Sequence, residues 1–167
     1  MNKQVWIEKA LGLGIQEFEI YQSTTVEKEM TWFQGQMDTL VSSKVTGTSI
    51  RGIVDGKMAN MALEEVDDDQ CEIILKSLIE QAHIISNEET DSLRKPEPIE
   101  YVKKDVTWNM ASTEYVNQVL QSLETKILAY DPRVIQVGYL GYSQGSGSRS
   151  IVNSLGMDVQ DADEMQY

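Results

Sequence analysis

The sequence has few of the residues that build disulfide-bonded, zinc-binding or secreted proteins. Its 167 residues include one cysteine, Cys71, and one histidine, His83. One thiol cannot form an internal disulfide, and no second histidine or cysteine stands near His83 to make a zinc pair. The sequence also has no Asn-x-Ser/Thr sequon and no apolar run near the roughly 18 residues of a membrane-spanning helix. We therefore expect a cytoplasmic protein with no signal peptide and no membrane partner.

Basic residues are also scarce. The chain has 14 Lys and Arg against 27 Asp and Glu, which gives a formal net charge of -13. Because this charge repels a phosphate backbone, nucleic acid is not expected as a direct partner. The remaining composition, 41% hydrophobic and 25% charged, is that of an ordinary folded protein. The length predicts a single domain over residues 1–167.

The negative charge is concentrated in the middle third, since residues 51–100 contain 5 basic and 13 acidic side chains. The densest part, Glu64–Asp69, stands just before a segment of helical periodicity. Its spacing lacks the alternating ligands and the glycine of a calcium loop. Carboxylates in a first helical turn, by contrast, complement the helix dipole. We interpret this run as the start of a helix rather than as a metal site.

The spacing of apolar residues predicts three helices and an exposed connection. Apolar residues recur every three to four positions over 3–13, 67–85 and 113–130. Ser112 or Thr113 can cap the third helix. The segment 87–100 is polar and contains Pro96 and Pro98, so we expect it to be an exposed connection.

Alternation with a period of two predicts the strands. Four of them, from Glu17 onward and over 37–43, 46–54 and 57–63, would form a meander, in which Gln34-Gly35 and Asp55-Gly56 are turns and Thr46-Gly47 opens the third strand. Residues 134–142 and 148–154 would form a hairpin around a flexible turn at 143–148. The expected fold is α+β, in which a largely antiparallel sheet, a four-stranded meander plus a carboxy-terminal hairpin, has helices packed on one face.

No catalytic, cofactor-binding or metal-ligating residue is predicted. His83 falls on the polar flank of the second helix and Cys71 on its buried stripe, where a thiol is poorly activated. Gly145-Ser146-Gly147 lacks the features of a dinucleotide loop, a Walker loop and a Gly-x-Ser-x-Gly elbow, so we interpret it as a turn. Four methionines of the strand region are expected to fill the core more readily than to form a binding surface: Met30, Met37, Met58 and Met61.

Several motifs follow one another in the order found in one protein family. Val45–Ala59, which contains Arg51 and the Asp55-Gly56 turn, precedes the acid-led helix, and Asp131–Val134 and Ser150–Gly156 come later. Over roughly residues 4 to 157 this set resembles the amino-terminal domain of the TldD/PmbA family, and more closely its PmbA-type branch. Members are described as metal-dependent peptidases that process peptides, or as modulators of DNA gyrase. Arg51 and the turn are interpreted as sheet architecture.

The resemblance implies a domain without a catalytic group. The zinc motif of the family, His-Glu-x-x-x-His, lies in the carboxy-terminal half of members more than twice as long, and it does not occur in these 167 residues. Zinc is therefore expected only in that missing half, and no cofactor in this chain. We expect the domain to contribute to the cleft for a peptide or protein substrate and to a homo- or hetero-dimer with a family member. An exposed sheet edge would take up the peptide as an added strand.

Two alternatives stay open. A non-enzymatic acidic interaction module would recruit a basic protein, and its binding would weaken steeply as salt rises. A hydrolase that uses a pair of carboxylates is the weaker alternative, because no pair stands out in the sequence.

Overall fold

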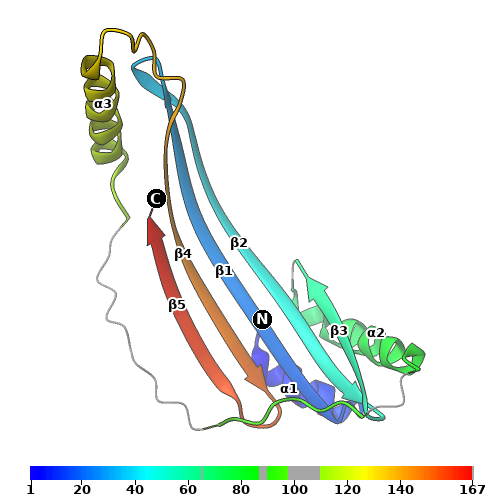
Figure 1. Ribbon diagram of the computed structural model, residues 1–167. Helices are drawn as coiled ribbons and strands as arrows, with labels where there is room; N and C mark the ends of the chain where they lie inside the picture. The colour runs from blue at the N-terminus through cyan, green and yellow to red at the C-terminus, as the bar shows by residue number, and fades with distance from the viewer. Residues whose placement is uncertain (65, 87–89, 98–109, 167) are drawn as a thin grey trace. The chain divides into compact units, whose positions relative to one another are not determined.

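The strands of the chain form one five-stranded antiparallel sheet with the order β3-β2-β1-β4-β5 (Figure 1). The computed structural model describes residues 1–64, 66–86, 90–97 and 110–166. Its elements are α1 (Lys3–Gly12), β1 (Glu17–Phe33), β2 (Gln36–Val54), β3 (Lys57–Leu63), a 3-10 turn (Asp68–Gln70), α2 (Cys71–Ile84), α3 (Thr113–Tyr130), β4 (Leu140–Asn153) and β5 (Asp158–Gln166). The predicted α+β class with a largely antiparallel sheet is confirmed, and so are the three helices.

The chain divides into two units, and β1, β2, β4 and β5 each contribute residues to both. The described residues of Met1–Thr24, Thr46–Val102 and Ser148–Ala162 make up the first unit. Those of Thr25–Val45, Lys103–Gly147 and Asp163–Tyr167 make up the second. The first unit therefore contains α1, α2 and β3, and the second contains α3.

The main hydrophobic core lies in the first unit, where α1 and α2 cover one face of the sheet. Alternate residues of β1 and β2 meet the apolar stripes of the two helices. The largest buried side chains of this core include Trp6, Phe18, Ile20, Ile50, Leu75 and Leu78. Gly52 of β2 lets α2 approach closely, because an added Cβ would lie 2.8 Å from Leu78 Cδ2.

Residues 90–97 cross the opposite face of the sheet. The backbone N–H of Leu93 donates to Glu17 Oε2 at 2.6 Å, and Asn153 Nδ2 donates to the Arg94 carbonyl oxygen at 3.0 Å. This stretch has no helix or strand, as predicted, but Leu93 is buried, so the prediction of a wholly exposed connection is wrong here. Residues 87–89 and 98–100 of that prediction lie outside the described residues.

A smaller core joins α3 to the sheet in the second unit. Met30 and Trp32 of β1 pack with Val116 and Leu120 of α3. The buried Glu124 carboxylate accepts from Trp32 Nε1 at 2.7 Å and from the Gly35 N–H at 3.3 Å. Ser112 caps the helix by accepting from the Tyr115 N–H, as predicted.

Two predicted interruptions between strands do not exist. Thr46-Gly47 lies inside β2 and residues 143–148 lie inside β4, so the meander has three strands rather than four. Gly47, Gly145 and Gly147 have extended backbone, whereas Gln34-Gly35 and Asp55-Gly56 have positive φ at both residues, as tight turns require. The carboxy-terminal hairpin joins β4 to β5 instead, and Gly156 (φ 92°) supplies its turn.

Candidate functional site

Three neighbouring strands of the first unit change from apolar to polar at the same level. On the face that α1 and α2 cover, side chains point the same way at every second residue. The sequence of side chains on this face is Ile20, Gln22, Thr24 along β1; Ile50, Thr48, Thr46 along β2; and Val152, Ser150, Ser148 along β4. Gln22 Nε2 donates to Thr48 Oγ1 at 3.3 Å, and the hydroxyl oxygens of Thr24 and Thr46 lie 3.0 Å apart. The hydrophobic core therefore ends along a line across the sheet, and a polar surface begins.

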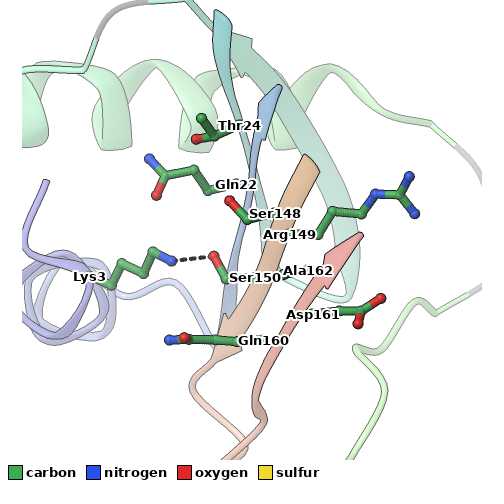
Figure 2. Close-up of a pocket in the computed structure, with 9 residues that line it drawn as sticks. All are labelled: Lys3, Gln22, Thr24, Ser148, Arg149, Ser150, Gln160, Asp161 and Ala162. Atoms are coloured by element: carbon green, nitrogen blue, oxygen red, sulfur yellow. Dashed lines mark hydrogen bonds between the residues drawn. The ribbon is translucent and has the colours of Figure 1, made fainter. Parts of the chain in front are cut away.

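The part of this polar surface on β1 and β4 forms the floor of an open groove of about 400 Å³ (Figure 2). The groove is lined by Lys3, Gln22, Thr24, Ser148, Arg149, Ser150, Gln160, Asp161 and Ala162. Lys3, from α1, donates from Nζ to Ser150 Oγ at 2.5 Å. Figure 2 shows the side chains of Arg149 and Asp161 pointing away from Gln22 and Ser150. Among the lining residues, Lys3 is therefore the charged side chain that faces the groove.

Asp68 fixes the helix that carries Lys3. Its Oδ1 accepts from the Asn2 N–H at 3.0 Å and from Trp6 Nε1 at 2.7 Å. These two hydrogen bonds, with the indole bond as the larger cause, lower the pKa of Asp68. Asn2 in turn caps α1 by accepting from the Val5 N–H. Through Asp68, the acidic run thus holds the amino-terminal helix in place.

The groove has the chemistry of a binding surface. Its floor offers hydroxyl and amide groups, which donate and accept hydrogen bonds, beside one ammonium group. No histidine is among the lining residues and Asp161 points away, so the Lys3 amine, which donates to Ser150 Oγ, is the titratable group of the lining that lies beside a serine hydroxyl. The arrangement suits a polar ligand with an anionic end.

The residues that the sequence analysis considered for catalysis or metal binding lie outside the groove. His83 Nε2 lies 3.6 Å from Asp55 Oδ2, and both side chains are largely exposed. Cys71 is fully buried, and burial raises the pKa of its thiol. Ser146 lies inside β4 and not in a turn. Asp67 begins the 3-10 turn ahead of α2 by accepting from the Asp69 N–H, so the interpretation of the acidic run as a helix start is confirmed.

The predicted role of the methionines is confirmed in part. Met30 is buried in the core of the second unit, and Met61 packs against the core of the first. Met37, however, is exposed on β2. Its surroundings are those of a surface residue and not of a core residue.

Within residues 1–64, 66–86, 90–97 and 110–166, no three His, Cys, Asp or Glu side chains are grouped so that they could hold a metal ion. In the same ranges, every helix falls short of the length and apolarity that crossing a membrane requires.

The groove was not predicted, although the sequence contains its signal. The alternation along β1 already places Gln22 and Thr24 on the face of Phe18 and Ile20. The sequence cannot show that β2 and β4 make the same change at the same level. The groove emerges only when β4 and β5, which are distant from β1 in sequence, take their places beside it in the sheet.

The comparisons with known proteins give one family-model match and several similar folds. Residues 18–86 match the model of PmbA/TldA metallopeptidase domain 1. No curated protein sequence matches the chain.

Among solved structures, TldE from Thermococcus kodakarensis is similar with a TM-score of 0.80 and 18% identity, over 97% of this chain and 37% of that one. A proposed modulator of a DNA gyrase from Thermotoga maritima is similar with a TM-score of 0.74 and 18% identity, over 98% of this chain and 37% of that one. A proposed modulator of DNA gyrase from Bacteroides thetaiotaomicron is similar with a TM-score of 0.71 and 17% identity, over 98% of this chain and 38% of that one. The chain thus spans little more than a third of the length of these relatives. The predicted resemblance to the amino-terminal domain of the TldD/PmbA family is confirmed, by the family model over residues 18–86 and by the fold over nearly the whole chain.

Proposed function

We propose that this chain acts as the non-catalytic amino-terminal domain of a TldD/PmbA-like, metal-dependent peptidase. In this role it contributes to the substrate cleft and to dimer formation. The observation that carries the proposal is the match of residues 18–86 to the first domain of a metallopeptidase family. The polar groove of the first unit supports the part of the proposal that concerns the cleft.

The chemistry of the groove favours an extended peptide as the ligand. A peptide main chain offers one donor and one acceptor for nearly every residue. The floor formed by Gln22, Thr24, Ser148 and Ser150 can satisfy these groups without selecting a side chain. Lys3 adds a positive charge that would attract a terminal carboxylate. The groove is therefore suited to holding a peptide by its backbone and by its carboxyl end.

A peptide titration of the 167-residue chain tests this proposal. An unstructured hexapeptide with a free carboxylate is added to the ¹⁵N-labelled chain, and the same peptide with an amidated end is added to a second sample. We expect the free peptide to shift the amide signals of Gln22, Thr24 and Ser148–Ser150. Lys3→Gln should weaken binding of the free peptide about tenfold, the loss expected for one charge-assisted hydrogen bond, and should leave the amidated peptide unaffected.

A matched control removes a lysine that lies away from the groove. Lys76 on α2 pairs with Glu72, so Lys76→Gln makes the same change of charge and should not alter binding. If neither peptide shifts the amide signals of the groove residues, the proposed role in the cleft is contradicted. Hydrolysis of the peptides by the chain with added zinc, abolished by a chelator, would contradict its non-catalytic nature.

A further inference from the structure

The outer edge of β2 is unpaired in the second unit. Strand β3 pairs with β2 from Thr48↔Leu63 to Val54↔Lys57. Since β2 begins at Gln36, its residues 36–45 have β1 on one side and no strand of the described sheet on the other (Figure 1). We call residues 36–45 the free edge.

The free edge lacks the features by which proteins protect unpaired strands. Such strands are usually short, bulged, rich in charge or interrupted by proline. The free edge contains no proline and two charged residues, Asp38 and Lys44. Its large apolar side chains are exposed, with Met37 at 38%, Leu40 at 48%, Val41 at 53% and Val45 at 64%. A strand with this composition and exposure is a template for pairing with another strand.

We propose that the free edge pairs with the free edge of a second copy of this chain, antiparallel and centred on Val41. In this register Asp38 of each copy lies opposite Lys44 of the other, so the dimer gains two cross-strand ion pairs. Met37 lies opposite Val45, and Val41 lies opposite its own counterpart. An antiparallel pair of identical strands has two-fold symmetry, which is the commonest symmetry of protein dimers.

The charge pattern favours a second copy over an unrelated peptide. Asp38 and Lys44 stand three residues before and three after Val41, and strand alternation places both on one face. Opposite charges at equal distances from a centre make a strand complementary to itself, and a peptide-binding edge has no need of this symmetry. Within the described residues Lys44 forms no ion pair, and Asp38 accepts a hydrogen bond from Thr31 Oγ1 at 3.3 Å. Both charges are therefore available to a partner.

This proposal rests on the dimer formation included in the proposed function, and it adds the surface and the register. It is independent of the groove and of Lys3. If the chain dimerises through the free edge but does not bind peptide, this inference stands and the proposed role of the groove in the cleft fails. If the chain binds peptide in the groove but stays monomeric, the role of the groove stands and this inference fails.

Two charge reversals test the register. In Asp38→Lys two lysine pairs would face each other across the edge, and in Lys44→Asp two aspartate pairs would. Because like charges directly opposite each other destabilise strand pairing, the dissociation constant of the dimer, measured by sedimentation equilibrium, should rise at least tenfold in each variant. An equimolar mixture of the two variants restores both ion pairs and should form the heterodimer, which native mass spectrometry identifies. The double variant should dimerise like the wild type.

The two reversals also separate pairing from general charge repulsion. Asp38→Lys makes the chain less negative, and Lys44→Asp makes it more negative. Repulsion between acidic chains would therefore strengthen one dimer and weaken the other, whereas the proposed pairing weakens both. Glu72→Lys on α2 makes the same charge change as Asp38→Lys at an exposed helix position and should leave the dimer intact. A monomeric wild-type chain, single variants that dimerise like the wild type, or a mixture that remains monomeric would overturn the proposal.

Discussion

At the scale of single residues, buried polar side chains fasten distant parts of the chain. Glu19, 2% exposed, accepts from Arg51 Nε at 3.0 Å and from Asn153 Nδ2 at 3.2 Å. These contacts join β1, β2 and β4 on the sheet face opposite the main core. The prediction of Arg51 as part of the sheet architecture agrees with this arrangement. The sequence could not supply the partners, because they are separated by 32 and 134 positions.

Asp68 should give the stability of the fold a dependence on pH. Its pKa lies below the ordinary value of 3.8 because the folded state donates hydrogen bonds to the carboxylate. Its contribution is therefore complete above the unfolded pKa and is lost as the pH falls through the lower folded value. We expect Asp68→Asn to lower the melting temperature at pH 7 and this difference to shrink below about pH 4. Calorimetry of both proteins from pH 7 to pH 2 measures this difference in melting temperature. A difference that stays constant over this range would contradict the assignment.

At the scale of elements, glycines explain which predictions succeeded. Gln34-Gly35 and Asp55-Gly56 were predicted as turns and have positive φ at both residues. Gly145 was also predicted within a turn, but an added Cβ would lie 3.2 Å from the Val26 carbonyl oxygen. Glycine there allows β4 to pass close to β1. A local pattern cannot distinguish a glycine that bends the chain from one that admits a neighbouring strand.

The packing of α2 on β2 depends on the absence of a side chain at Gly52. In Gly52→Ala the new Cβ would lie 2.8 Å from Leu78 Cδ2 and 3.1 Å from Ile15 Cγ2, and both neighbours are buried. We expect this variant to lose about 1–3 kcal/mol of unfolding free energy in urea denaturation, the usual cost of overpacking. Leu78→Ala alone should cost about 2–5 kcal/mol because it leaves a cavity.

The double variant provides the control for this prediction. The methyl group that Gly52→Ala adds would occupy part of the space that Leu78→Ala leaves. The double variant should therefore lose less stability than the two single losses combined. Strictly additive losses would show that the two residues do not meet.

At the scale of the whole molecule, exposed apolar side chains are distributed unevenly. Among the large hydrophobic residues exposed in the described chain, the first unit contributes four, namely Val5, Leu11, Ile73 and Ile84. The second unit contributes the majority, including the residues of the free edge and others around α3. Composition gave no hint of this division, because 41% hydrophobic residues is an ordinary value. The uneven exposure comes from the small core of the second unit.

A hydrophobic dye should detect this difference. Leu128 and Ile135 line one hollow of about 420 Å³ in the second unit. We expect the native chain to bind bis-ANS, and Leu128→Ser with Ile135→Ser to reduce the fluorescence by roughly half, since contiguous apolar surface is what such dyes bind. Ile73→Ser with Ile84→Ser removes two exposed side chains from the first unit and should change the signal little. Equal losses from both pairs of substitutions would contradict an uneven surface.

The line at which β1, β2 and β4 change from apolar to polar also separates positions that tolerate substitution differently. Side chains on the apolar side of the line are buried, so their replacement costs folding free energy. Those of the groove are partly or fully exposed, and substitutions at such positions usually change stability by no more than about 0.5 kcal/mol. Substitutions can therefore accumulate in the groove without unfolding the domain. One sheet can thus keep its architecture while the polar side chains of the groove change.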